Sequence, residues 1–245
     1  MQFLTHGEDG FERAFERVVR DRRESDADVA RDVGRILNEV RERGDKALVE
    51  YTMRFDDHRL TEDSDWRITA EECAAAHAAL DPDLRDALQL AADRIRAYHE
   101  GQLPQNRDYT DDIGMRIGAR WNAVEAAGLY VPGGRAAYPS SLLMNAIPAK
   151  VAGVDRLVVT TPTPKGESNP LVLAAAHIAG VDEIWRVGGA QAVASLAYGT
   201  DRIARVDVVT GPGNAWVAEA KRQLYGVVGI DMVAGPSEIL VIAEK

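Results

Sequence analysis

The sequence predicts an α/β protein in which a Rossmann-like parallel sheet, covered by helices, follows a mainly helical N-terminal lobe. Up to about residue 110, apolar residues recur at helical spacing, and beyond it short, continuously apolar runs alternate with helical patterns. Such runs are typical of parallel strands that helices bury on both faces. We therefore divide the chain into a helical lobe (1–112), an α/β lobe (113–236) and the first strand of a return into the other lobe (237–245).

The N-terminal lobe begins with an amphipathic helix, which Ser25 or Asp26 would cap and Gly44 would end. Its apolar face comprises Val29, Val33, Ile36, Leu37 and Val40. A shorter helix follows, and its inner face carries Ala47, Leu48 and Tyr51. Asp81 and Pro82 form a cap and first turn that open a long helix. Residues 66–69 predict a short strand between these helices.

The α/β lobe opens with strand-like alternation at 114–123 and then repeats strand–helix units. The expected strands are 127–131, 156–161, 183–187 and 205–210. The expected helices are 140–152, 170–179, 190–198 and 214–224. The helix at 170–179 is clearly delimited, because Asn169 caps it, Pro170 occupies its first turn and Gly180 ends it. Residues 238–243 form a further apolar run that predicts a buried strand.

Composition indicates an ordinary globular protein, with 46% hydrophobic and 28% charged residues. The net charge of −10 disfavours nucleic acid as a partner, because an acidic surface repels phosphate backbones. No apolar run approaches the roughly 20 residues that cross a bilayer, and no signal peptide is evident. Cys73 is the only cysteine, so we expect no intrachain disulfide and a cytoplasmic location.

Glycine-bearing turns follow three of the expected strands and should lie at one edge of the sheet, where ligands bind in open α/β folds. These turns are 132–134, 188–191 and 211–214. Gln191 and Asn214 are neutral amides that could hold a nicotinamide or a ribose. Each glycine-bearing segment alone is more simply explained as an ordinary turn, but the three together favour a nucleotide-binding lobe over a purely structural one. Asp231 stands 20 residues after Gly211, near the spacing of a ribose-binding acid, but we interpret this spacing as coincidental because the glycine motif is incomplete.

The histidines show no pair at metal-ligand spacing, and we expect a packing role for Cys73 in its alanine-rich helical stretch. That placement argues against an aldehyde dehydrogenase that works through a thiolate beside the cofactor. Residues 234–238 are most simply a turn with a capping serine.

Six long motifs, in order along the chain, resemble histidinol dehydrogenase. They are RGDKALVEYTMRFD (43–56), GLYVPGG (128–134), YPSSLLMNAIPAKVAG (138–153), VGGAQAVASLAYGT (187–200), VTGPGNAWVAEAKRQ (209–223) and IDMVAGPSEILVIA (230–243). The resemblance runs through essentially the whole chain and covers about the first half of a family member.

The resemblance implies an aldehyde-dehydrogenase-like sheet lobe that binds NAD through Tyr130, Gln191 and Asn214, with Ser237 contacting the substrate. Enzymes of the family oxidise L-histidinol to L-histidine through histidinaldehyde, with two NAD in succession, as the last steps of histidine biosynthesis. Their zinc ligands and their proton-transferring Glu–His pair would follow Lys245. We therefore expect no catalytic or metal-binding residue in this chain, and no activity from it alone. The intact enzyme is expected to be a homodimer.

Two alternatives stay open on the sequence. The chain could be the cofactor lobe of a related dehydrogenase that acts on another small polar alcohol, or a non-catalytic nucleotide-binding module.

Overall fold

The computed structural model describes residues 4–133 and 137–233, except for the side chains of residues 17–27. Within this part of the chain, the main sheet has six strands in the order β1-β6-β5-β4-β7-β8. The strands are β1 (Arg67–Ile68), β4 (Ala126–Tyr130), β5 (Arg156–Thr160), β6 (Glu183–Trp185), β7 (Val208–Thr210) and β8 (Gly229–Ile230). Neighbours from β6 to β8 are parallel, whereas β1 pairs antiparallel with β6. The predicted α/β fold is confirmed.

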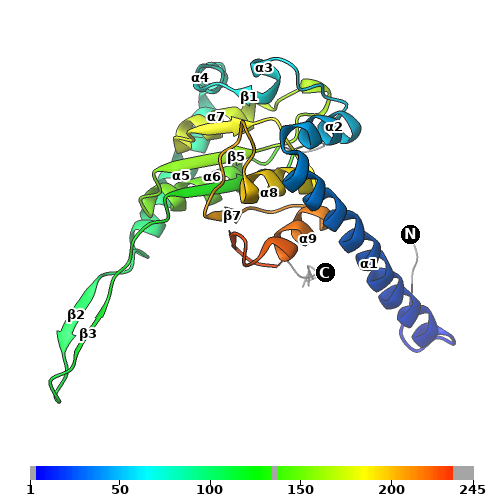
Figure 1. Cartoon of the computed structure of the whole chain (residues 1–245), viewed down its shortest axis with the longest axis horizontal. Helices are drawn as coiled ribbons and strands as arrows, with labels where there is room; N and C mark the ends of the chain where they lie inside the picture. The colour runs from blue at the N-terminus through cyan, green and yellow to red at the C-terminus, as the bar shows by residue number, and fades with distance from the viewer. Residues whose placement is uncertain (1–3, 134–136, 234–245) are drawn as a thin grey trace, which may run out of the picture.

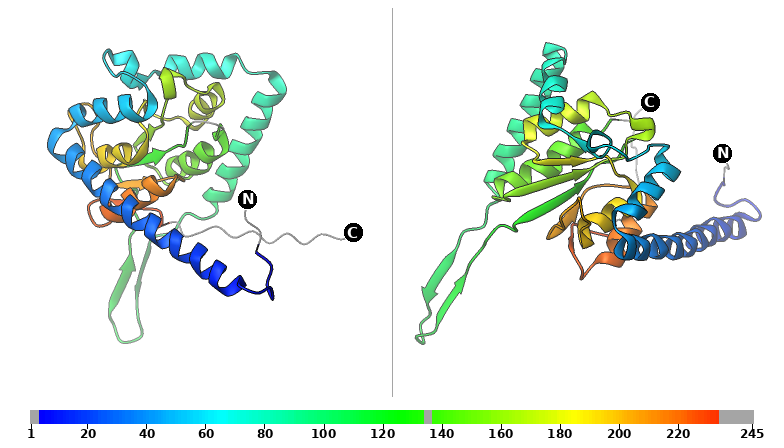
Figure 2. Two further views of the ribbon diagram at one scale, coloured as in Figure 1. Left: turned by 90° about the vertical axis from the view of Figure 1, so that its right-hand side faces the viewer. Right: turned by 45° about the horizontal axis from the view of Figure 1, so that its top comes forward.

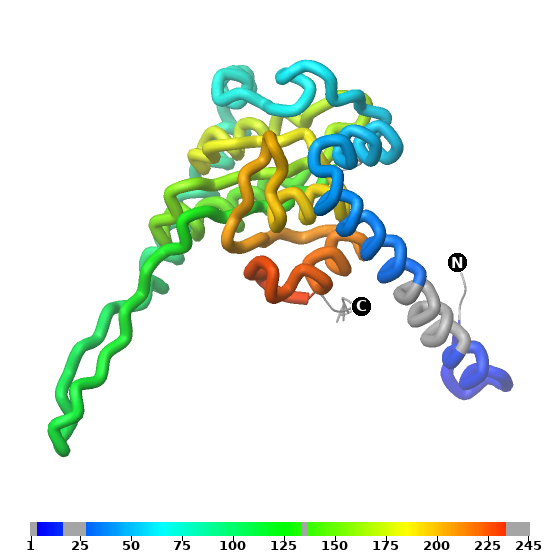
Figure 3. The backbone as a smooth tube through the Cα atoms, in the orientation of Figure 1, coloured from blue at the N-terminus to red at the C-terminus, as the bar shows by residue number. Residues whose placement is uncertain are grey.

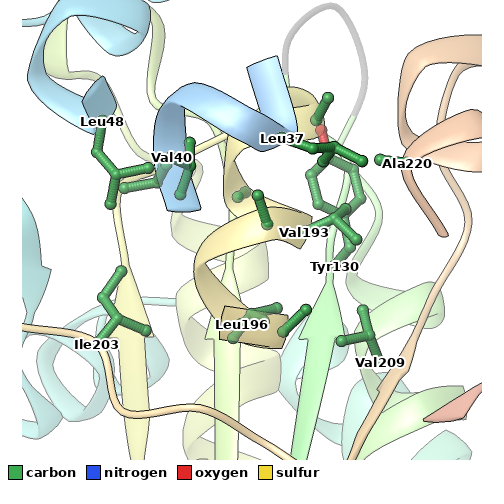
Figure 4. Close-up of a cluster of buried hydrophobic side chains, with 14 of the residues drawn as sticks. Leu37, Val40, Leu48, Tyr130, Val193, Leu196, Ile203, Val209 and Ala220 are labelled. Carbon is green, nitrogen blue, oxygen red and sulfur yellow. The ribbon is translucent and has the colours of Figure 1, made fainter. Parts of the chain in front are cut away.

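One face of the sheet is covered by α1 (Phe11–Arg43), α2 (Asp45–Asp56), α8 (Gly189–Tyr198) and α9 (Ala215–Leu224), with α1 lying against both α8 and α9 (Figure 1). The apolar stripe predicted for the first helix forms this layer's core. Figure 4 shows Leu37 and Val40 of α1 facing Val193 of α8. The first helices thus pack against α8 and α9, which lie on this face of the sheet, while the lobe boundaries at 112/113 and 236/237 stay predictions.

The other face is covered by α4 (Ala70–Ala78), α5 (Pro82–Glu100), α6 (Pro139–Val151) and α7 (Pro170–Ala179). Local sequence explains how these helices begin. Asp81 accepts a hydrogen bond from the backbone nitrogen of Asp83 at 3.0 Å, and Asn169 accepts one from Leu171 at 3.0 Å, as the sequence predicted for both caps. Two short helices, α3 (Asp63–Trp66) and the 3-10 helix η1 (Pro164–Gly166), complete the described helices. No helix among the described residues combines the length and apolar character needed to span a bilayer.

Two predictions for the first half of the chain were wrong in detail. Helix α1 begins at Phe11, after Gly10, and runs through positions 25 and 26, which therefore are not its caps. Serine and aspartate favour caps but do not break a helix, and residues 11–43 contain no proline and a single glycine, Gly34, which a long helix tolerates. Its predicted end is correct, because the backbone nitrogen of Gly44 donates to the Val40 carbonyl at 2.9 Å.

The second detail concerns residues 114–123, which do not lead directly into the main sheet. They contribute β3 (Arg116–Ala119) to a two-stranded antiparallel hairpin with β2 (Arg107–Thr110), in which Tyr109 lies opposite Ile117. All residues of both strands are exposed, and the hairpin projects from the body of the molecule (Figures 1 and 2). We call residues 107–119 the arm.

Candidate functional site

The parallel strands reverse their order at β4, and the candidate site lies there. From β4 the chain proceeds outward to β5 and β6, then returns to β7 on the other side of β4 and continues to β8, a path that the tube in Figure 3 follows. In such sheets, a crevice forms outside the carboxyl ends of the strands where the two halves diverge. The turns after β4, β6 and β7 meet there, which confirms that these three turns share one edge.

A cavity of about 800 Å³ occupies this crevice. That volume lies in the range of small-molecule and cofactor pockets. Tyr130, Gln191 and Asn214, the three predicted contacts, all line it. Its remaining walls are largely apolar, with rings from Phe55, Trp216 and several prolines.

Tyr130 ends β4 and stands with its ring in the core beneath the cavity (Figure 4). Its hydroxyl oxygen accepts a hydrogen bond from the backbone nitrogen of Gly189 at 3.2 Å. Burial raises the pKa of the phenol above its ordinary value, so the hydroxyl keeps its proton near neutral pH. Tyr130 therefore joins the end of β4 to the first turn of α8 and retains a proton to donate.

Gln191 lies in the first turn of α8 and is buried, being only 1% exposed. Its Oε1 atom is fully buried and has no hydrogen-bond partner among the described residues. An unsatisfied buried acceptor costs roughly 1–3 kcal/mol. Because Gln191 lines the cavity, an N–H or O–H donor on a bound ligand would remove that cost.

Asn214 has a local role that its sequence position alone leaves open. Its Oδ1 atom caps α9 by accepting hydrogen bonds from the backbone nitrogens of Trp216 and Val217, each at 3.1 Å. Both of these bonds use the amide oxygen. Contact with a ligand would therefore fall to the amide nitrogen of Asn214.

Two helices, α8 and α9, begin at the cavity wall. Free backbone N–H groups and the helix dipole make such N-termini favourable for phosphate. Of the described residues that line the cavity, none is lysine or arginine. A bound diphosphate would therefore be stabilised by backbone N–H groups.

The backbone conformation of the turn after β7 requires glycine at its first position. Gly211 has φ 116°, and a Cβ atom there would lie 2.2 Å from the carbonyl oxygen of Tyr130. The backbone of this turn thus lies directly against the end of β4. The two walls of the cavity meet at this contact.

An ion pair between a buried lysine and a partly exposed aspartate supports the same turn. Lys221 Nζ lies 2.6 Å from Asp231 Oδ1 and also donates to the Gly211 carbonyl at 2.8 Å. Asp231 Oδ2 accepts from the Gly211 nitrogen at 3.0 Å. The spacing between Gly211 and Asp231, which we interpreted as coincidental, therefore has a structural cause, and Asp231 braces the turn.

Several cavity residues were not predicted. A fourth turn, with Pro162 and Pro164, follows β5 at the same edge, and the rule applied to the other strands would have found it. Phe55 and Asp56 reach the cavity from the end of α2. No sequence signal links them to the sheet edge, because only the packing of α2 on α8 brings them there.

The remaining candidates lie elsewhere. Cys73 is the buried residue of α4, and burial raises the pKa of its thiol to about 11. The rings of His77 and His177, which are far apart in the sequence, lie 5.0 Å apart where α4 packs on α7. The described residues hold no group of three or more His, Cys, Asp or Glu side chains suited to a metal ion. Ser237 and the expected strand at 238–243 lie outside the described residues.

Comparison with known proteins of similar sequence identifies the family of this chain. The family model described as histidinol dehydrogenase matches residues 19–245. The chain belongs to the histidinol dehydrogenase family. It is 63% identical over 235 residues to the histidinol dehydrogenase of Zymomonas mobilis subsp. mobilis, covering 96% of this chain and 54% of that protein. It is 60% identical to that of Ruegeria pomeroyi, covering 100% of this chain and 56% of the relative.

A solved structure agrees with this membership. The crystal structure of histidinol dehydrogenase from Elizabethkingia anophelis matches with a TM-score of 0.79 and 34% identity, covering 84% of this chain and 48% of that one. The chain thus spans about half the length of the curated relatives it matches.

Proposed function

We propose that this chain forms the NAD-binding half of an enzyme that oxidises L-histidinol to L-histidine through histidinaldehyde, as the last steps of histidine biosynthesis. The observation that carries the proposal is the cavity at the strand-order reversal, where Tyr130, Gln191 and Asn214 lie together against two helix N-termini. Family membership supplies the reaction.

The cavity fits a dinucleotide in size, apolar lining and polar groups. Its rings and prolines offer surfaces for the flat adenine and nicotinamide groups. The first turns of α8 and α9 offer N–H groups for the diphosphate. The unpaired Oε1 of Gln191 can accept a hydrogen bond from the N–H of a carboxamide or from a ribose hydroxyl.

When bound, NAD supplies the hydride acceptor for both oxidations. The residues of this chain bind and orient it. The Tyr130 hydroxyl donates a hydrogen bond, Gln191 accepts one, and the amide nitrogen of Asn214 donates one. The apolar walls exclude water from the reacting face. Ser237 is proposed to contact the substrate at the edge of this site.

Zinc, which the family uses to hold its substrate, does not fit the described residues, since no suitable group of ligands exists among them. We therefore derive no step that involves the metal, and propose that its ligands and the proton-transferring Glu–His pair belong to the other half of the enzyme. We further propose a cytoplasmic homodimer. The apolar side chains that the arm exposes, such as Ile113 and Met115, offer a surface for subunit contact.

The test is NADH formation from L-histidinol, with zinc supplied, by this 245-residue chain alone and by the chain fused to the C-terminal half of the Zymomonas mobilis relative. We expect turnover only from the fusion. Turnover by the short chain alone would mean that the metal and the base are assigned to the wrong half. If the fusion oxidised another polar alcohol in place of histidinol, the substrate assignment would be wrong.

A further inference from the structure

Asp56 places a carboxylate in the wall of the cavity, and one oxygen of that carboxylate lacks a hydrogen-bond donor. It is the last residue of α2 and lines the cavity together with Tyr130 and Gln191. Its Oδ2 atom is fully buried and has no hydrogen-bond partner among the described residues. Burial raises the pKa of this carboxyl, opposed only by the charge of the nearby His58.

Two other partly buried carboxylates among the described residues accept hydrogen bonds from neighbouring side chains or backbone nitrogens. Glu183 accepts from Arg156 and from the indole nitrogen of Trp185, and Asp231 accepts from Lys221 and Gly211. Asp45 also has an unpaired buried oxygen, but its other oxygen lies 4.0 Å from Arg202. Asp56 differs from these because it borders an 800 Å³ cavity, so its missing donor can come from a ligand.

The chemistry of the wall narrows the kind of donor. Gln191 presents a second buried, unpaired acceptor to the same cavity, so the site as a whole calls for a ligand rich in O–H or N–H groups. An ionised carboxylate only accepts hydrogen bonds and can take two adjacent hydroxyls at once. The aromatic ring of Phe55, next along the chain, also lines the cavity and offers a surface for a base attached to the same sugar.

We propose that Asp56 accepts hydrogen bonds from the vicinal hydroxyls of the adenosine ribose and so makes the site select NAD over its 2′-phosphorylated form, NADP. This inference rests on the proposed function. In NADP one of these hydroxyls is replaced by a phosphate, which would bring like charges together at short range in a partly buried site. The described cavity lining contains no lysine or arginine that would neutralise the added phosphate.

The experiment measures NAD and NADP binding to the 245-residue chain by calorimetry, with Trp216 fluorescence as a second signal because that residue lines the cavity. The test variant is Asp56→Asn, and the control is Asp57→Asn, which changes the adjacent exposed carboxylate. The wild-type chain should prefer NAD at least about tenfold, as expected for a charge-assisted contact. Asp56→Asn should weaken NAD binding about tenfold while NADP binding stays equal or improves, and Asp57→Asn should keep the wild-type ratio.

Thermal unfolding without ligand gives a second readout. Removing an unpaired, partly buried charge should leave the melting temperature of Asp56→Asn equal to or above that of the wild type, whereas a structural role would lower it. The inference is overturned if NAD binds and the NAD-to-NADP ratio is the same in Asp56→Asn as in the wild type, or if the wild-type chain binds both equally. If the wild-type chain binds neither dinucleotide, the proposed function fails as well.

Discussion

Lys221 and Asp231 form a partly buried ion pair, with 2.6 Å between Nζ and Oδ1, and together they hydrogen-bond both backbone polar groups of Gly211. The lysine donates to the Gly211 carbonyl and the aspartate accepts from the Gly211 nitrogen. Because Gly211 begins the turn that carries Asn214, this pair fixes one wall of the cavity from the side away from the ligand. The position of the wall is thus set before any ligand arrives.

Replacing Lys221 with methionine should destabilise the chain by about 2 kcal/mol, because the buried contact of Nζ with the Gly211 carbonyl is lost and the Asp231 carboxylate loses its cation. Lys46→Met, at an exposed lysine, should change the free energy of unfolding by less than about 0.5 kcal/mol. Urea unfolding of the two variants and the wild type measures the difference. Equal stability of Lys221→Met and Lys46→Met would show that the pair does not hold the turn.

Replacing Gly211 with alanine should be more harmful than the same change at Gly226. Both glycines have positive φ, 116° and 94°, but a Cβ atom at Gly226 meets nothing within 4 Å, whereas one at Gly211 meets Tyr130. Backbone strain alone should cost Gly226→Ala about 1 kcal/mol. The collision should cost Gly211→Ala about 2 kcal/mol more. Denaturant midpoints that coincide for the two variants would contradict the close approach of this turn to β4.

The thiol of Cys73 should react slowly with a disulfide reagent at pH 8. Its pKa is raised to about 11 and its side chain is buried, so little thiolate is accessible. The same chain in denaturant should react rapidly. The native chain should still bind a dinucleotide after treatment with an alkylating reagent. The Cys73→Ala variant should bind it equally well. Fast labelling of the native chain, with loss of binding, would instead reopen chemistry based on this thiol.

Asp65 should contribute stability that disappears in acid. Its Oδ2 accepts from Thr61 Oγ1 at 2.6 Å and from the Glu62 nitrogen at 2.8 Å, and these bonds lower its pKa to about 2. A carboxyl with a lowered folded-state pKa stabilises the fold above its ordinary pKa, near 4, and loses that contribution as the pH falls toward 2. Asp65→Asn should therefore flatten stability between pH 4 and 2, while Glu42→Gln, an exposed change on α1, should not. Identical acid limbs for Asp65→Asn and the wild type would contradict the lowered pKa.

The sequence predicted the sheet well because its strands are buried on both faces and its helices carry strong end signals. Asn169, Pro170 and Gly180 delimit α7 at the positions expected. The alternation at 114–123 indicated β3 of the arm, but its partner β2 was missed, because all residues of β2 are exposed and no burial pattern marks them. The start of α1 was missed because a possible cap inside a helix resembles a cap that begins one.

The residues of the candidate site likewise fall into those that the sequence could locate and those that it could not. Turns that follow strands could be located from sequence, because parallel strands bring their carboxyl ends together. Asp56 could not be located, since it reaches the cavity only through the packing of α2 on α8. The contact of His77 with His177 likewise depends on two helices that are far apart in the sequence.

The central claim, that the cavity beside Tyr130 holds NAD, is tested most directly by titrating NAD into the 245-residue chain and into its Gln191→Leu variant. Leucine matches the buried volume but removes the unpaired amide oxygen, so the variant should fold at least as stably as the wild type. We predict one NAD bound per wild-type chain and binding weakened at least about tenfold in the variant. No binding to the folded wild-type chain, or equal binding to both proteins, would contradict the account.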